Sequence, residues 1–313
     1  MKQALRKFAL AVGLGFLLAP GLAGAEDMRV IMVSHGQAAD AFHGIVKNGF
    51  FQAGKDLGVS VDYRAPETFD MVAMGQLIDA AVNQRPDGIV VTLPDTDALG
   101  PAVKRAVESG IPVIAVNSGQ DAYKTLGALA FVGQDEALAA RMAGERLKEA
   151  GGKKAICINV EPGNVTIDIR CNSFTEGFGG AVNVLQTSMD PADIEAKVRA
   201  ALQADPEIDT ILSTAAMVAG EPALKALKAT GQLGKINLGS FDLSPAMLEA
   251  VRDGNAIFCI DQQQYMYGYL PVALLQLYKH SKIVPANDVL TGPRFVTKDM
   301  AAEVIDLSTK GIR

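Results

Sequence analysis

Four polar side chains in this sequence have the chemistry to hold a neutral molecule that is rich in hydroxyl groups. The carboxylates of Asp40 and Asp242 accept hydrogen bonds from vicinal hydroxyls, and the amide of Asn117 both donates and accepts them. Arg170 adds a planar fork of donors for ligand oxygens. Each of these residues could instead have a structural role. Either Asp could cap a helix, Asn117 could bond its own backbone in a turn, and Arg170 could form a salt bridge within its own domain.

Phe42, His43 and Gln262 complete the set of candidate ligand-binding residues. Phe42 and His43 stand at the start of a predicted helix, where their rings can lie flat against the apolar C–H faces of a sugar ring. Gln262 directly follows a predicted strand, and its amide also donates and accepts hydrogen bonds. The alternatives are a core position for Phe42 and a surface position for His43. We interpret the next two glutamines, residues 263–264, as helix entry and structural hydrogen bonding.

Catalytic and metal-binding motifs are absent from the sequence, which argues against an enzyme. The three histidines, His35, His43 and His280, lack the spacing of metal ligands. No nucleophile elbow, Walker A loop or HExxH motif occurs. The glycine-rich run 177–180 falls at the end of a predicted helix, not after a strand, so it does not read as a dinucleotide loop. We therefore expect a non-catalytic protein with no metal and no cofactor.

The elements that must position the candidate residues alternate between short apolar strands and amphipathic helices. One series of strands and helices runs over 28–117, and the pattern restarts at a strand over 128–132. Strands that are nearly continuous in Val and Ile indicate parallel sheets with helices on both faces. Two such units predict an α/β fold of two doubly wound parallel-sheet lobes. After a last helix over 265–281, only a short tail is expected.

The strand ends predict where a ligand binds. In open parallel sheets, ligands sit beyond the carboxyl ends of the strands. Two lobes that face each other would therefore share one cleft. The segments that follow the predicted strands are 34–35, 92–93, 117–118, 161–170, 214–217, 241–242 and 261–262.

Composition and the first residues limit the partners and the location. The chain has 313 residues, a net charge of -6 and a pI of about 5.2, which gives no basic surface for nucleic acid. Basic residues at 2–7, an apolar run over 8–18 and a small-residue site at 23–25 predict a signal peptide over residues 1–25, cleaved before Glu26. The apolar run is short for a bilayer span, although a retained membrane anchor is the alternative. We expect a monomer in the periplasm.

Three cysteines, Cys157, Cys171 and Cys259, remain in a chain that is expected to be exported. Cys157 lies in a predicted strand and Cys171 near the start of the next helix, so a bridge between them is geometrically plausible. The alternative is three buried free thiols.

Several short segments resemble the ribose-binding-protein branch of periplasmic sugar-binding proteins, the receptors of ABC importers. The resemblance covers nearly the whole chain after residue 28, and it depends on the order and spacing of its markers. These are Asp87-Gly88-Ile89-Val90-Val91, Gly110-Ile111-Pro112-Val113-Ile114, Gly133-Gln134-Asp135-Glu136, Arg170 followed by Phe174, Gly239-Ser240-Phe241-Asp242 and Asp261-Gln262.

The resemblance implies two hinged lobes that close on a sugar and present it to an ABC permease. It assigns 26–127 and 255–286 to the N-terminal lobe, and 128–254 and 287–313 to the C-terminal lobe. Its ligand-binding positions match Asp40, Phe42, His43, Asn117, Arg170, Asp242 and Gln262, and Phe241 would add an apolar edge. The alternative is a receptor that presents a furanosyl signal or a nucleoside to a sensor or chemoreceptor.

Departures from the family pattern bear on which sugar is bound. Ribose binders carry an arginine where Ser118 stands here and an asparagine where Ala216 stands, and their first loop favours Asn and a second aromatic over Asp40 and His43. These differences favour another pentose, a hexose, a deoxysugar or a linear alditol over ribose.

Overall fold

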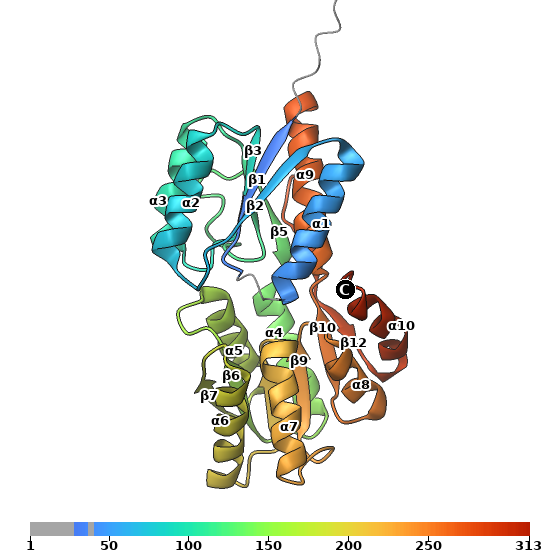
Figure 1. Cartoon of the computed structure of the whole chain (residues 1–313). Helices are drawn as coiled ribbons and strands as arrows, with labels where there is room; N and C mark the ends of the chain where they lie inside the picture. Colours follow the sequence, from blue (N-terminus) through green and yellow to red (C-terminus); the bar gives the residue numbers. More distant parts are fainter. Residues whose placement is uncertain (1–27, 37–40) are drawn as a thin grey trace, which may run out of the picture.

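The protein consists of two α/β lobes stacked end to end, as a computed structural model that describes residues 28–36 and 41–313 shows (Figure 1). Each lobe is built on one six-stranded sheet. In the first lobe the strand order is β11-β5-β4-β3-β1-β2, and all neighbouring strands are parallel. These strands are β1 Arg29–Val33, β2 Ser60–Arg64, β3 Gly88–Val91, β4 Val113–Val116, β5 Ala130–Gln134 and β11 Val289–Gly292.

The sheet of the second lobe repeats this arrangement position by position. Its order is β12-β10-β9-β8-β6-β7, and every pair is parallel except β12 with β10. The likeness makes β4 and β9, or β5 and β10, equivalent positions in the two lobes. The strands are β6 Lys154–Asn159, β7 Ala181–Gln186, β8 Thr210–Ser213, β9 Asn237–Phe241, β10 Phe258–Asp261 and β12 Arg294–Val296.

Helices cover both faces of each sheet, as the continuous apolar strands predict. In the first lobe, α2 and α3 bury the face that carries Ile31 and Val33, whereas α1 and α9 bury the face that carries Val30 and Met32. In the second lobe, α4 and α5 pack on one face, and α6, α7, α8 and α10 pack on the other. The helices are α1 Ala41–Leu57, α2 Met71–Asn83, α3 Thr96–Glu108, α4 Glu136–Glu149, α5 Val165–Phe178, α6 Pro191–Ala204, α7 Glu221–Ala229, α8 Pro245–Asp253, α9 Gln264–Ser281 and α10 Lys298–Thr309.

Side-chain caps fix where many of these helices begin, and therefore where the loops at the cleft end. Asp70, Asp95, Asp135 and Asn164 each accept a hydrogen bond from a backbone N–H in the first turn of the helix that follows. Asn164 starts α5 at Val165, so Arg170 lies in the second turn of this helix.

The structure places each crossing between the lobes later in the chain than the family resemblance implies. The second lobe does not begin at residue 128, because β5 pairs with β4 in the first sheet. The return at residue 255 also comes too early, because β10 pairs with β9 in the second sheet. The last crossing falls after β11, beyond residue 287, because β11 extends the first sheet. Each crossing strand completes its sheet before the chain leaves the lobe.

The expectation of a short C-terminal tail is wrong, because the last residues form β11, β12 and α10. Sequence periodicity gives little signal here, since both strands are short. The helix α10 packs against α8 of the second lobe. The N-terminal segment 1–25, predicted to be a signal peptide, and Asp40 lie outside the described residues.

The structure joins Cys157 of β6 to Cys171 of α5 in a disulfide, and Cys259 is a buried free thiol. The bridge closes a loop with a sequence separation of 14 residues, next to the Arg170 helix turn. Chain-entropy arguments give about 3 kcal/mol of stabilisation for such a loop.

We expect the Cys157→Ser/Cys171→Ser variant to unfold at a temperature roughly 6–12 °C lower than the wild type, at about 2–4 °C per kcal/mol for a chain of this size. Differential scanning calorimetry with and without a thiol reductant measures this difference. The reductant should lower the melting temperature of the wild type and leave that of the double variant unchanged. An oxidised wild type with three titratable thiols would contradict the bridge.

Candidate functional site

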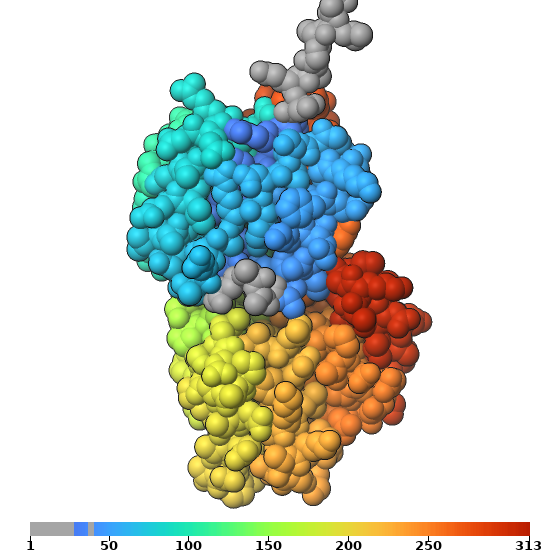
Figure 2. All heavy atoms as spheres, viewed as in Figure 1, coloured from blue at the N-terminus to red at the C-terminus, as the bar shows by residue number. Residues whose placement is uncertain are grey.

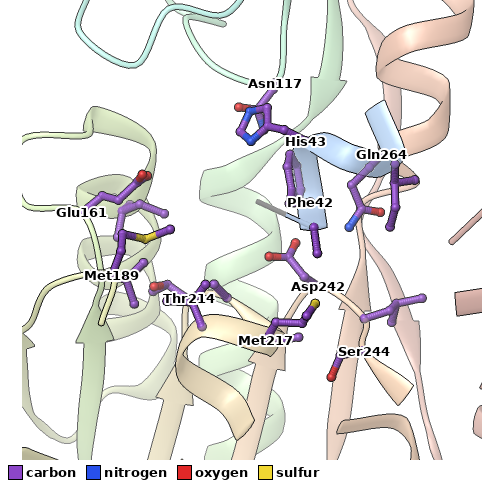
Figure 3. Close-up of a pocket in the computed structure, with 18 of the residues that line it drawn as sticks. Phe42, His43, Asn117, Glu161, Met189, Thr214, Met217, Asp242, Ser244 and Gln264 are labelled. Atoms are coloured by element: carbon purple, nitrogen blue, oxygen red, sulfur yellow. The ribbon is translucent and has the colours of Figure 1, made fainter. Parts of the chain in front are cut away.

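A cavity of about 280 Å³ lies between the two lobes, at the carboxyl ends of both sheets. Its size is near the lower end of small-molecule pockets, which span roughly 300–1,000 Å³. Side chains from both lobes line it (Figure 3). The first lobe contributes Phe42, His43, Asn117 and Gln264, and the second contributes Glu161, Arg170, Met189, Thr214, Met217 and Asp242.

Asn117 and Asp242 occupy equivalent places in the two lobes. Asn117 follows β4 and Asp242 follows β9, and each has a left-handed backbone with φ of 65°. The N–H of each donates to the next strand of its own sheet: Asn117 to Val132 at 3.1 Å, and Asp242 to Ile260 at 2.9 Å. Asn and Asp tolerate this conformation better than other non-glycine residues. The left-handed turn directs the amide of one lobe and the carboxylate of the other into the same cavity (Figure 3).

Phe42 and His43 come from the first turn of α1 and line the cavity, as the sequence predicts. The surface alternative for His43 fails, because His43 is only 5% exposed. Its ring contacts the rings of Phe42 and His35, with centroids 5.1 and 4.6 Å away. His35 is held in turn by a 2.8 Å contact between its Nδ1 and the hydroxyl of Thr92. These rings give the first-lobe wall an aromatic surface.

Arg170 lines the cavity, but its guanidinium is engaged by the second lobe itself. Its Nε and Nη2 donate to the carboxylate of Glu136 at 2.7 and 2.9 Å, and Nη1 donates to the carbonyl of Thr214 at 2.8 Å. Burial alone would lower the pKa of Arg170, but the charge and hydrogen bonds of Glu136 raise that pKa above its ordinary value. The salt bridge, considered above as the structural alternative, is therefore present. Three of the five guanidinium N–H groups have protein acceptors.

Phe241 and Gln262 are not among the residues that line the cavity. Phe241 is fully buried, and its ring lies under the Arg170 guanidinium at 4.3 Å, so it supports that side chain and adds no apolar edge. Gln262 is also fully buried, and its amide donates to the carboxylate of Asp242. The hydroxyl of Tyr267 donates to Gln262 Oε1 at 3.0 Å, and burial raises the pKa of Tyr267 well above its ordinary value. Gln262 thus positions Asp242 from behind the cavity wall.

Other residues at the cavity were partly or wholly missed by sequence reasoning. Glu161 and Thr214 fall in the strand-end segments that the fold predicts to be at the cleft. Gln264 and Met189 were not anticipated, since Gln264 was interpreted as structural and Met189 follows an edge strand. The end of α10 and the residues after it were not anticipated either, although Ser308, Thr309 and Gly311 line the cavity. Strand-end topology could not indicate these positions.

Direct hydrogen bonds join the lobes on opposite sides of the second lobe. The N–H of Val165, at the start of α5, donates to the carbonyl of Pro94 at 3.1 Å. The amide of Asn48 on α1 donates to the carbonyl of Gly311 at 3.1 Å, so the segment after α10 rests on the first lobe (Figures 1 and 2). Arg313 also pairs with the buried Asp261 at the end of β10. The lobes are therefore in contact around the cavity.

The described part of the chain holds no cluster of three or more residues suited to binding a metal ion. Within residues 28–36 and 41–313, no helix combines the length and apolar character that a membrane crossing requires.

Two parallel-sheet lobes that face each other across a polar, partly aromatic cavity define a two-lobed receptor for a small molecule. Residues 30–282 match the family model described as "Periplasmic binding protein domain". The chain belongs to this periplasmic binding protein family, which is one of binding proteins and not of enzymes.

Characterised relatives include the xylose/arabinose-binding protein of Sulfolobus acidocaldarius, 26% identical over 77% of this chain; the match spans 64% of that protein's own length. The D-allose-binding periplasmic protein of Escherichia coli is 26% identical over 87% of this chain and 91% of its own. A carbohydrate transporter of Acidothermus cellulolyticus, solved in complex with myo-inositol, superposes with a TM-score of 0.87. That structure is 34% identical to this chain and covers 92% of it, with its own chain covered completely.

Proposed function

We propose that this chain is the periplasmic substrate-binding protein of an ABC importer, and that it captures a neutral monosaccharide or sugar alcohol. The observation that carries the proposal is the convergence of Asn117 and Asp242, from equivalent strand ends of opposite lobes, on one cavity of small-molecule size. The names of the relatives, which bind pentoses, allose or myo-inositol, support the same class of ligand.

The charges around the cavity favour a neutral ligand over an anionic one. Arg170 is a buried cation at the wall, but Glu136 already neutralises it. The carboxylates of Asp242 and Glu161 line the same wall. A hydroxyl donates readily to these carboxylates, whereas a uronate or a phosphate ester would meet like charge in a desolvated site.

Ligand capture follows from hinge closure of the two lobes. The ligand contacts Asn117 from one lobe and Asp242 from the other, so its binding free energy favours the closed arrangement over the open one. Each buried hydroxyl that lacks a partner would cost free energy, which makes the site selective. The closed form is then presented to a membrane permease, after export and cleavage of the leader before Glu26.

A thermal-shift panel tests the proposal on the mature protein. The panel contains myo-inositol, D-xylose, L-arabinose, D-ribose and D-allose, with D-glucuronate as the anionic comparison. At a concentration of about 100 times Kd, a ligand of the folded state adds about 2.7 kcal/mol, which raises the melting temperature by roughly 5–10 °C. At least one neutral member should give this shift and glucuronate should not. A panel in which no neutral member shifts the transition would reject the ligand class.

A further inference from the structure

Three consecutive glutamines at the start of α9 have very different surroundings. Gln262 uses both ends of its amide, donating to Asp242 and accepting from Tyr267. Gln263 has a left-handed backbone with φ of 60°, and its amide donates to the carbonyl of Thr291. Both side chains are thus engaged in holding the crossing between the lobes.

Gln264, the first residue of α9, differs from both of its neighbours. It is 1% exposed and lines the cavity between the lobes, opposite Glu161 and Met189 (Figure 3). Its Oε1 is buried and has no hydrogen-bond partner in the described part of the chain. Its Nε2 likewise makes no hydrogen bond to the described residues, whereas the amides of Gln262 and Gln263 do. The carboxamide of Gln264 therefore has no partner at either end among the described residues; its Oε1 is buried, and the residue forms part of the cavity wall.

A buried amide with neither end paired is costly, and most buried polar groups in folded proteins have partners. The surrounding structure nevertheless fixes this amide in place. The left-handed turn at Gln263 starts α9 directly before Gln264, and Tyr267, one turn along the helix, is fully buried. The cost is offset if a ligand completes the hydrogen bonds when the lobes close.

We propose that Gln264 is a ligand-binding, specificity-determining residue whose carboxamide donates to and accepts from hydroxyl oxygens on the first-lobe side of the ligand. The inference rests on the proposed function. It assigns the direct contact to Gln264 and a positioning role to Gln262, the residue that the family resemblance implies. A ligand must then carry a hydroxyl at the position that faces the start of α9, and an analogue lacking that hydroxyl leaves the amide unpaired.

The Gln264→Met variant tests this assignment, because Met has a similar volume and no hydrogen-bonding amide. The wild type and the variant are titrated calorimetrically with myo-inositol, or with the panel member that gives the largest thermal shift. We expect about 10- to 100-fold weaker binding, because one or two hydrogen bonds in a desolvated site are lost. The ligand-free variant should melt at the wild-type temperature or higher, since it no longer buries an unpaired amide.

Gln276→Met is the matched control on the same helix. The Gln276 amide donates to the carbonyl of Leu57 at 3.0 Å and does not line the cavity. This variant should lose stability without ligand and keep the wild-type affinity, the opposite pattern to Gln264→Met.

A series of monodeoxy analogues of the bound sugar then identifies the hydroxyl that Gln264 recognises. In the wild type, one analogue should bind about tenfold more weakly than the parent sugar. In Gln264→Met, the same analogue and the parent sugar should bind with equal affinity.

Unchanged affinity in Gln264→Met, or a ligand-free variant that melts well below the wild type, would overturn the assignment. The first result would remove the ligand contact, and the second would show that the amide has a structural partner. If the wild type binds no member of the panel, the proposed function fails. The ligand-free melting temperature of Gln264→Met still reports separately on whether the amide is structural.

Discussion

Asp242→Asn is expected to weaken ligand binding at least about 100-fold without unfolding the protein. The carboxylate of Asp242 lines the cavity, and Gln262 holds it from behind. Hydrogen bonds to a charged group contribute about 1.5–3 kcal/mol each, so two ligand hydroxyls on one carboxylate represent roughly 3–6 kcal/mol. Asn keeps the shape, tolerates the left-handed backbone and can still accept from Gln262, so the fold is retained. Calorimetric titration with the best panel ligand measures the loss.

Asp253→Asn is the matched control for this variant. It makes the same charge change in the same lobe, but Asp253 is on the surface of α8 and pairs there with Arg252. Its affinity should equal that of the wild type. Equal affinities for all three proteins would remove Asp242 from the site and, with it, the main support for the proposed ligand class.

The sequence predicts the fold well because the two signals that define it, apolar strand runs and helix-end residues, are both local. Continuous runs such as Val30–Val33 and Gly88–Val91 can be buried on both faces only in a parallel sheet, and the structure places them there. Helix ends also carry a local signal where a cap or a glycine marks them, as Asp70 and Gly254 do. The lobe crossings and the C-terminal elements depend on which sheet a short strand extends. That choice is a long-range property with little local signal.

The candidate site likewise contains residues that local sequence signals predict and residues that they do not. Asn117 and Asp242 could be predicted because strand-end topology fixes their position and a left-handed turn suits their residue types. The roles of Gln262, Gln264 and Phe241 could not be predicted, because adjacent side chains point in different directions. Whether Gln262 or Gln264 reaches the cavity depends on the turn between β10 and α9, which a positional resemblance does not describe.

Hydrogen bonds and packing within the protein hold the Arg170 side chain in place at the cavity wall without a ligand. Glu136 begins α4, Arg170 lies on α5, and Gln134 at the end of β5 donates to Glu136 at 3.0 Å. This network runs from the first-lobe sheet, through the crossing, to the cavity wall. Phe241 supports the guanidinium from below. Arg170 is thus held rigidly, and the ligand does not have to order a long side chain.

Glu136→Met is expected to destabilise the second lobe by about 3–5 kcal/mol, because it leaves the buried Arg170 cation without its carboxylate. The melting temperature of the ligand-free variant should be roughly 10 °C lower than that of the wild type. The double variant Glu136→Met/Arg170→Met should recover most of this loss, since a buried ion pair replaced by apolar side chains of similar volume is often neutral in stability.

The same double variant separates the two roles of Arg170 when its affinity is measured. Three N–H groups of the Arg170 guanidinium donate to protein acceptors. The other two, one on Nη1 and one on Nη2, have no such acceptor among the described residues, and the side chain lines the cavity. We therefore expect the stable double variant to bind the best panel ligand about tenfold more weakly, the equivalent of one hydrogen bond. Wild-type affinity in this variant would assign Arg170 to the wall of the second lobe alone. A double variant as unstable as Glu136→Met would contradict the pairing argument, because removing the cation would then have relieved nothing.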